Sequence, residues 1–245
     1  MSGSRPNKGA SDRPILAFDT AGSACSVVIA TDDRIIAEER RAMRHGHAEA
    51  LVPMIDAAMR RAHLKPRALA MVVTTVGPGG FTGIRAGLAT ARGIALATGA
   101  ALVGVTGFAA VAALIETSQQ AGSQSGLLIV LDSRRDDFYV QGFDRKREPL
   151  WPPQVVAPPA LPALAAQFDD GVLLAGDAAE RAAAALAGKP FVLVPDTAPY
   201  ARGVLAAALK RLDSGIPLEP PRPLYLRPPE VTFPAGARTT QGAAS

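Results

Sequence analysis

The sequence predicts an α/β fold made of two related halves, each with its own mixed sheet. The chain opens with three apolar runs separated by short polar turns, a pattern typical of an antiparallel strand meander. Later apolar runs alternate with helical patterns, which favours parallel strands joined by helices. A strand that ends in an aspartate and turns into a second strand occurs twice, around Asp19 and around Asp132. This echo predicts the two halves, although their residues do not align as a repeat.

The composition is that of a globular protein. The chain has 245 residues, 48% hydrophobic and 20% charged, enough for one large domain or two smaller ones. A single cysteine, Cys25, cannot form an internal disulfide, which favours the reducing cytoplasm. Without an apolar run of 18 residues we expect no membrane span. The formal charge of +4 is compatible with an RNA-related role, but basic residues alternate with acids, which favours a solvated surface.

The elements of the first half follow from apolar spacing and turn residues. The expected strands are 15–20, 25–30, 34–37, 71–76 and 101–105, and the expected helices are 48–62, a helix of small residues from 82 to 95, and 108–116. Pro53 lies within the first of these helices. Because proline is tolerated only near a helix N-terminus, we expect the regular helix to begin close to Val52.

The second half begins after the Ser/Gln/Gly segment 118–126, which is the best internal boundary. Its expected elements are strands at 127–132, 138–143, 172–175 and 191–194, helices at 178–187 and 198–212, and a proline-rich stretch at 149–162 that is irregular or an edge strand. The expected organisation is a disordered tail at 1–13, a first lobe at 14–110, a second lobe at 111–220, and a return segment and tail at 221–245.

The stretch Val76-Gly-Pro-Gly-Gly-Phe-Thr-Gly-Ile-Arg85 joins a predicted buried strand to a helix. Glycines permit positive φ and close approach, and Thr82 could cap the helix. One interpretation is an anion-binding corner, with Gly79, Gly80 and Thr82 near a nucleotide. The other is a tight turn that lets the helix pack on the sheet. Asp19 is similarly open, as a nucleotide-site carboxylate or as a turn residue.

Groups that could perform catalysis are few. The three histidines do not form a zinc motif, and the sequence contains no G-x-S-x-G elbow, no C-x-x-C pair and no G-K-[ST] after the glycines. We therefore predict no catalytic residue and no metal site in this chain.

Two helices have faces that could pack within the chain or meet a partner helix. The first helix is apolar on more than one side, since Val52 and Met59 lie outside its main stripe. In the second, Gly83, Gly87 and Ala91 recur every four residues, which allows close approach by another helix. Both possibilities remain open at this point.

Four segments resemble the bacterial TsaB (YeaZ) family. They are residues 15–28, 47–53, 76–87 and 223–227, of which 77–85 is the most specific. The resemblance implies a two-lobed fold like that of actin, Hsp70 and sugar kinases. It also implies a part in making N6-threonylcarbamoyladenosine (t6A) at adenosine 37 of tRNAs that read codons starting with A.

The resemblance also implies the partners. Members of the family are thought to be non-catalytic subunits that bind the catalytic TsaD, with the TsaE ATPase joining them and tRNA reached through the complex. The family meets TsaD, or a second copy of itself, through its two N-terminal helices. The contact residues expected here are Leu51, Met54, Ile55, Ala58, Gly83, Gly87, Ala91 and Ile94. No cofactor is expected to be required, although ATP or ADP could bind at the interface with TsaD.

The small number of catalytic groups agrees with the non-catalytic role that the resemblance implies. The positions that match the metal-binding histidines of TsaD fall at about Gly107 and Val111, and the turn Ser133-Arg-Arg-Asp136 lacks the glycines of a phosphate clamp. Two rival functions are kept. An ATPase or kinase would use Asp19 and the glycine-rich loop, and a glycoprotease-like peptidase would need a metal pair or nucleophile that the sequence does not offer.

Overall fold

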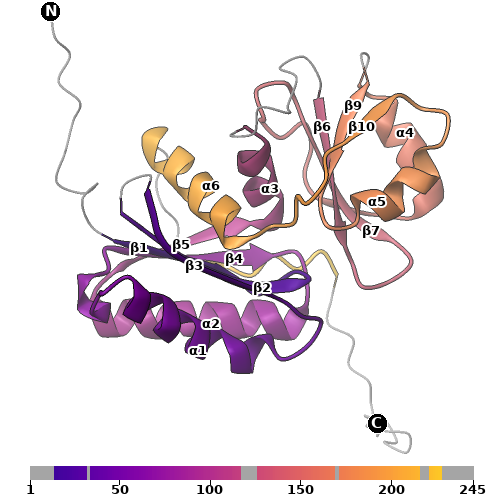
Figure 1. The fold of residues 1–245 in the computed structure, drawn as a ribbon. Coiled ribbons are helices and arrows are strands. Elements are labelled where there is room, and N and C mark those ends of the chain that lie inside the picture. The colour runs from indigo at the N-terminus through magenta and orange to yellow at the C-terminus, as the bar shows by residue number, and fades with distance from the viewer. Residues whose placement is uncertain (1–13, 32–33, 117–125, 169–170, 216–220, 228–245) are drawn as a thin grey trace, which may run out of the picture.

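The structure, a computed structural model, describes residues 14–31, 34–116, 126–168, 171–215 and 221–227. The predicted tail at 1–13 and nearly all of the predicted boundary at 118–126 lie outside these residues. The described chain forms two five-stranded mixed sheets with helices on their faces and between them (Figure 1). The prediction of an α/β fold with one mixed sheet in each half is confirmed.

The first sheet has the order β3-β2-β1-β4-β5. Its strands are β1 (Ile15–Asp19), β2 (Ala24–Thr31), β3 (Arg34–Ala42), β4 (Met71–Gly77) and β5 (Ala101–Thr106). β1, β2 and β3 form an antiparallel meander, and β4 and β5 run parallel to β1. β3 continues beyond the predicted end at Ala37 because it pairs with β2 as far as Ala24 opposite Ala42.

The second sheet repeats this plan. Its strands are β6 (Gly126–Asp132), β7 (Phe138–Phe143), β8 (Gln154–Val156), β9 (Val172–Ala175) and β10 (Phe191–Leu193), in the order β10-β9-β6-β7-β8. β6, β7 and β8 form the antiparallel meander, and β9 and β10 run parallel to β6. β8 is an edge strand within the proline-rich stretch, as one reading of that stretch required. The two halves inferred from the echo around Asp132 therefore share one topology.

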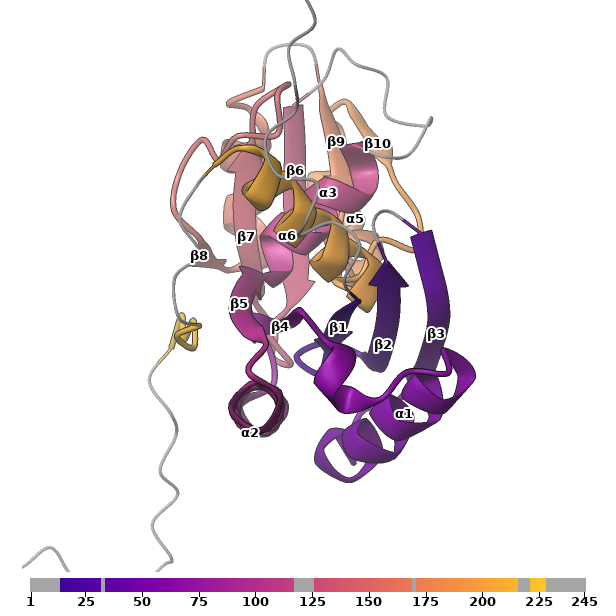
Figure 2. The ribbon, with the colours of Figure 1, turned by 90° about the vertical axis from the view of Figure 1, so that its left-hand side faces the viewer.

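Six α-helices complete the layers. They are α1 (His47–Arg61), α2 (Phe81–Thr98), α3 (Gly107–Glu116), α4 (Leu161–Ala165), α5 (Ala179–Ala183) and α6 (Ala201–Asp213) among the described residues. In Figures 1 and 2, α1 and α2 cover one face of the first sheet, α3 and α6 lie between the sheets, and α4 and α5 cover the outer face of the second sheet. The sequence analysis did not predict α4, which has only five residues.

α6 returns to the first sheet, although its residues fall in the range predicted for the second lobe. Ala201, Val204, Leu205 and Ala208 lie on one helical side and pack against β1, β4 and β5. α3 is shared between the sheets. Its Ala110 joins the same cluster, whereas its Phe108 and Val111 pack against the second sheet. The core between the sheets is therefore built from both halves of the chain.

α1 begins at His47, so the expectation that its regular part starts near Val52 is wrong. Pro53 lies inside the helix. It removes one helical hydrogen bond, the one to the carbonyl of Glu49. Glu49, Val52 and Pro53 are all exposed, so the loss falls on the solvent side of the helix, where water can reach the carbonyl. Leu51 and Met54, on the other side, are fully buried and fix the helix to the sheet.

Candidate functional site

The glycine-rich turn lets α2 approach the β1–β2 turn. Gly79 has φ 154°, and a Cβ atom there would lie 2.3 Å from the carbonyl oxygen of Ala21. The Gly80 N–H donates to that same oxygen at 2.9 Å. The helix begins with Gly80 as N-cap, without a side-chain cap. Thr82 is therefore not the cap, since it lies one residue inside the helix and is exposed. These contacts match the tight-turn interpretation of the stretch.

The small residues of α2 serve this same packing. A Cβ on Gly83 would lie 2.0 Å from the carbonyl oxygen of Thr20, and one on Gly87 would lie 2.5 Å from the Thr20 hydroxyl. That hydroxyl donates to the Gly83 carbonyl at 2.8 Å. Gly83 and Gly87 are thus buried within the chain, which was one of the two possibilities left open for this face.

The predicted contact residues on both helices lie inside the chain. Leu51, Met54, Ile55, Ala58, Gly83, Gly87 and Ala91 are buried, and Ile94 is half-buried. They join α1 and α2 to the sheet and to the β1–β2 turn, and of these eight residues Ile94 alone keeps part of its side chain exposed. The exposed side of the same helices carries other residues. Val52 is 56% exposed and Leu96 is 89% exposed, and a Cβ on Gly93 would meet no atom within 4 Å.

Two equivalent aspartate turns face the space between the lobes. The Ala21 N–H donates to Asp19 Oδ1 at 3.2 Å, and the Arg134 N–H donates to Asp132 Oδ1 at 2.9 Å. Both aspartates end the first strand of their sheet, so the repeat extends from topology to turn chemistry. Asp19 is a turn residue in this sense, as one of its two readings required.

Asp19 has an unusual electrostatic environment. It is 1% exposed, and this burial raises the pKa of its carboxyl group to about 7, with the negative charge of Asp177 adding to the effect. Burial also raises the pKa of Asp177, which follows β9 in the second lobe. A Cβ on Gly22 would lie 3.6 Å from a carboxyl oxygen of each. The two carboxyl groups therefore both lie close to Gly22.

A pocket of about 220 Å³ opens beside this pair. Its lining includes Asp177, Glu180, Asp196 and Tyr200. The Arg40 guanidinium lies 3.4 Å from the centre of the Tyr200 ring and pairs with Asp196 at 3.2 Å. Three acidic side chains make this pocket unfavourable for the phosphates of a nucleotide.

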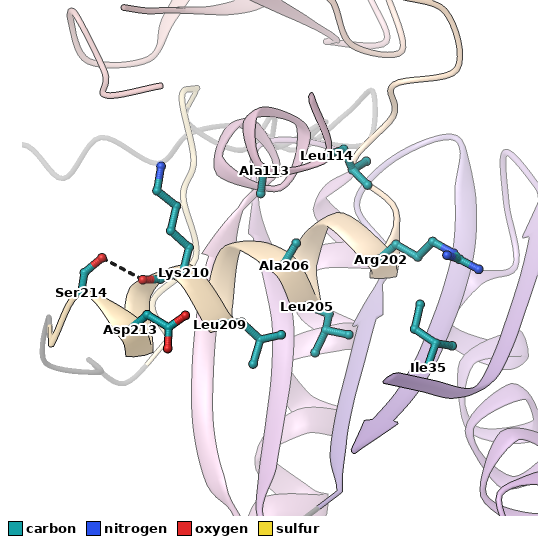
Figure 3. Close-up of a pocket in the computed structure, with 10 residues that line it drawn as sticks. All are labelled: Ile35, Ala113, Leu114, Arg202, Leu205, Ala206, Leu209, Lys210, Asp213 and Ser214. Carbon is teal, nitrogen blue, oxygen red and sulfur yellow. Dashed lines mark hydrogen bonds between the residues drawn. The ribbon is translucent and has the colours of Figure 1, made fainter. Parts of the chain in front are cut away.

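A larger pocket of about 630 Å³ lies along α6, beside α3 and β3 (Figure 3). Leu205, Leu209 and Ile35 supply apolar surface. Arg202 stands at one end, where its guanidinium forms two bonds to the Glu38 carboxylate at 2.6 and 2.7 Å. The sequence analysis did not predict this pocket, and its lining residues suggest no reaction.

Elements of a metal site are missing where the resemblance would place them. Gly107 packs near Leu131 and Pro199, and Val111 is fully buried in the core. Within the described ranges, His, Cys, Asp and Glu side chains form no group of three or more that could hold a metal. The described helices also include none long and apolar enough to cross a membrane.

The return segment meets the glycine-rich stretch, a contact that the sequence analysis did not anticipate. The Leu224 N–H donates to the Val76 carbonyl at 2.7 Å. The Tyr225 hydroxyl lies 3.2 Å from Arg85 Nε, and the Arg85 guanidinium lies 3.6 Å from the centre of the Phe81 ring. Two of the four segments that carry the family resemblance thus form one structural unit.

The comparisons with known proteins agree with this architecture. The family described as TsaD, tRNA N6-adenosine threonylcarbamoyltransferase, matches residues 35–209. The structure of YeaZ from Pseudomonas aeruginosa superposes with a TM-score of 0.74 at 23% identity, covering 87% of this chain and 100% of that one. The chain belongs to the TsaB/YeaZ family. A ROK hexokinase from Thermus thermophilus, with a TM-score of 0.50 at 15% identity, shares the fold, which confirms the actin- and sugar-kinase-like class.

Two relatives match this chain over different lengths. The tRNA threonylcarbamoyladenosine biosynthesis protein TsaB of Escherichia coli is 29% identical over 140 residues, which cover 56% of this chain and 58% of that protein. An uncharacterised protein of Mycobacterium tuberculosis is 34% identical over 233 residues, covering 89% of this chain and 93% of that protein. The matches thus span only about three fifths of the first TsaB relatives.

Proposed function

We propose that this chain is a non-catalytic subunit required for t6A formation at adenosine 37 of tRNAs reading codons that start with A. In this role it is a scaffold and activator of TsaD, with TsaE as a further partner and tRNA reached through the assembled complex. Membership of the TsaB/YeaZ family supports the pathway, because the E. coli relative is named for threonylcarbamoyladenosine biosynthesis.

We propose that TsaD binds to the exposed side of α1 and α2. The two helices pack side by side on the first sheet, and each presents a large apolar side chain to solvent. Leu96 on α2 is 89% exposed and Val52 on α1 is 56% exposed. Removing such apolar surface from water against a partner helix would be favourable. α2 also carries Arg85 and Arg92 but no acidic residue, so an acidic partner helix would complement it.

The pocket of about 220 Å³ and the residues at positions 107 and 111 support a non-catalytic role. That pocket is lined by acids, and core residues stand at Gly107 and Val111, the positions that match metal ligands. The proposal accordingly includes no cofactor required by this chain. Any ATP or ADP would bind at the junction with TsaD.

The decisive experiment measures complex formation and tRNA modification together. The purified chain is mixed with TsaD from the same organism and analysed by size-exclusion chromatography with light scattering. t6A is then measured by mass spectrometry of nucleosides after TsaE, tRNA and threonylcarbamoyl-adenylate are added. We expect a stable complex, and t6A only when this chain is present. Leu96→Glu and Val52→Glu should abolish both.

Val192→Glu is the matched control, because Val192 is 61% exposed on the edge strand β10, in the other lobe. It should bind and activate TsaD as the unchanged chain does. Absence of a complex with the unchanged chain would refute the proposal. If calorimetry then detected ATP binding, and hydrolysis was lost in Asp19→Asn, the rival ATPase or kinase function would replace it.

A further inference from the structure

Arg134 crosses from the second lobe to the first. It lies in the β6–β7 turn, and its Nη2 donates to the Gly22 carbonyl at 3.1 Å. Its Nη1 donates to the Arg44 carbonyl at 3.2 Å. Gly22 belongs to the β1–β2 turn, and Arg44 lies just before α1. One side chain thus joins two separate backbone segments of the first lobe to the second lobe.

The turn that carries Arg134 is held in place by its neighbours. Arg134 has φ 62°, a left-handed conformation that disfavours non-glycine residues. Its N–H bonds to Asp132 Oδ1, which also accepts from Arg181 Nη2 at 2.7 Å. Arg181 Nη1 donates in turn to the Arg135 carbonyl at 2.7 Å. These bonds hold the strained backbone of Arg134 in place.

The first lobe is shaped to receive this side chain. A Cβ on Gly80 would lie 3.0 Å from the guanidinium carbon of Arg134, so any other residue at position 80 would crowd it. The Arg134 guanidinium also affects the buried His47. Its pKa is lowered first by burial and then by the positive charge of Arg134. The guanidinium therefore lies where the β1–β2 turn, the glycine-rich turn and the start of α1 meet.

We propose that Arg134 is an interlobe latch, which holds the turns at Gly22 and Arg44 to the second lobe. Two-lobed proteins commonly close around a ligand that bridges the lobes. In this chain a guanidinium supplies the bridge by donating to carbonyls of the opposite lobe. The latch is independent of the proposed function, since it concerns only the conformation of this chain.

Hydrogen exchange in the full chain tests the latch at two amides. The Gly80 N–H donates to the Ala21 carbonyl at 2.9 Å, and the Met43 N–H donates to the Ser23 carbonyl at 3.0 Å. Both bonds end on the turn that Arg134 holds. In Arg134→Ala we expect these two amides to exchange roughly tenfold faster, the order of effect of losing bonds from a charged donor. Arg134→Lys should give an intermediate rate, because one ammonium group cannot reproduce the guanidinium fork.

Arg67→Ala is the matched control, because Arg67 is exposed in the short 3₁₀ turn after α1. It should leave both rates unchanged. Amides of the central strands β4 and β6 should keep their protection in every variant, which separates opening of the cleft from loss of global stability. Rates at Gly80 and Met43 within twofold of the unchanged chain in Arg134→Ala would overturn the latch. An equal rise across β4 and β6 would overturn it as well. If Arg134→Ala does not fold, the same criteria apply to Arg134→Lys.

Discussion

The rings of Phe81 and Tyr225 lie with their centres 5.0 Å apart and their planes at 37°. This contact fixes residues 221–227 to the start of α2. The same segment continues to the second lobe, where Leu226 packs against the core beside the second sheet and Arg227 forms an ion pair with Asp137. The return segment thus contacts both lobes.

Substitution of Tyr225 should show how much this contact stabilises the fold. Tyr225→Ala removes both the ring pair and the bond to Arg85, and should lower the free energy of unfolding by about 1–3 kcal/mol. Tyr225→Phe keeps the ring and loses only the hydroxyl, so its effect should be clearly smaller. Urea unfolding monitored by circular dichroism measures both. Equal effects would show that the ring pair contributes nothing.

Two glycines of α2 should respond in opposite directions to alanine. Gly83→Ala places a methyl group against the Thr20 carbonyl, at 2.0 Å before any shift, and should cost about 1–3 kcal/mol. Gly93→Ala meets no atom within 4 Å and should stabilise the protein by about 0.5–1 kcal/mol, because alanine is the better helix former. Thermal unfolding of the two variants under one set of conditions checks the contrast. A destabilised Gly93→Ala would contradict the open space around Gly93.

The buried carboxyl group of Asp19 should make stability depend on pH. Its pKa rises from an ordinary 3.8 to about 7 in the folded chain, so the folded state holds a proton that the unfolded state releases. Stability should therefore fall as the pH rises from about 4 to about 7, and then level off. Asp19→Asn carries no charge at any pH and should lose most of this slope. It should thus gain stability relative to the unchanged chain at pH 8 more than at pH 4.5.

Melting temperatures across that pH range measure the slope. Asp56→Asn is the control, since Asp56 is exposed and pairs with Arg60 on the same helix. A slope that Asp19→Asn leaves intact would assign the pH dependence to other groups, of which Asp177 is the first to test.

The exposed helical side should also govern self-association. We propose further that the free chain forms a homodimer through the same surface that meets TsaD. Leu96→Glu should then convert it to a folded monomer, because Leu96 makes little contact with its own chain at 89% exposure. Light scattering over a range of protein concentrations gives the mass. A dimer that persists in Leu96→Glu would place the dimer contact elsewhere.

The sequence predicted the elements well because apolar periodicity reports directly on burial. The repeat around Asp132 also predicted the second half, since an aspartate at a strand end tends to form the same turn wherever it occurs. Periodicity could not say which covering helix belongs to which sheet, so the return of α6 to the first sheet was missed. That choice depends on packing between residues far apart in the chain, such as Val204 and Val73, which belong to one cluster in the core between the sheets.

For the candidate contact residues too, the sequence pattern could not show which part of the chain packs against them. The spacing of Gly83, Gly87 and Ala91 correctly indicated close approach, but the partner is the β1–β2 turn of the same chain. A small residue does not reveal what approaches it. The exposed set was present on the opposite helical side, at Ala89, Gly93 and Leu96. Nor could any local pattern show that Arg134 reaches Gly22, because the two are 112 residues apart in the chain.

The position of α6 has a consequence for how the chain folds during synthesis. The first sheet is complete in sequence once β5 ends at Thr106, yet the helix that covers much of its inner face begins only at Ala201. At a ribosomal rate of about 5–20 residues per second, α6 is synthesised on the order of ten seconds after β5, and until then it cannot cover that face. During this time water can reach the apolar side chains that pack in that layer, such as Ile15, Val73 and Val103. This interval is when the nascent chain is most exposed to aggregation.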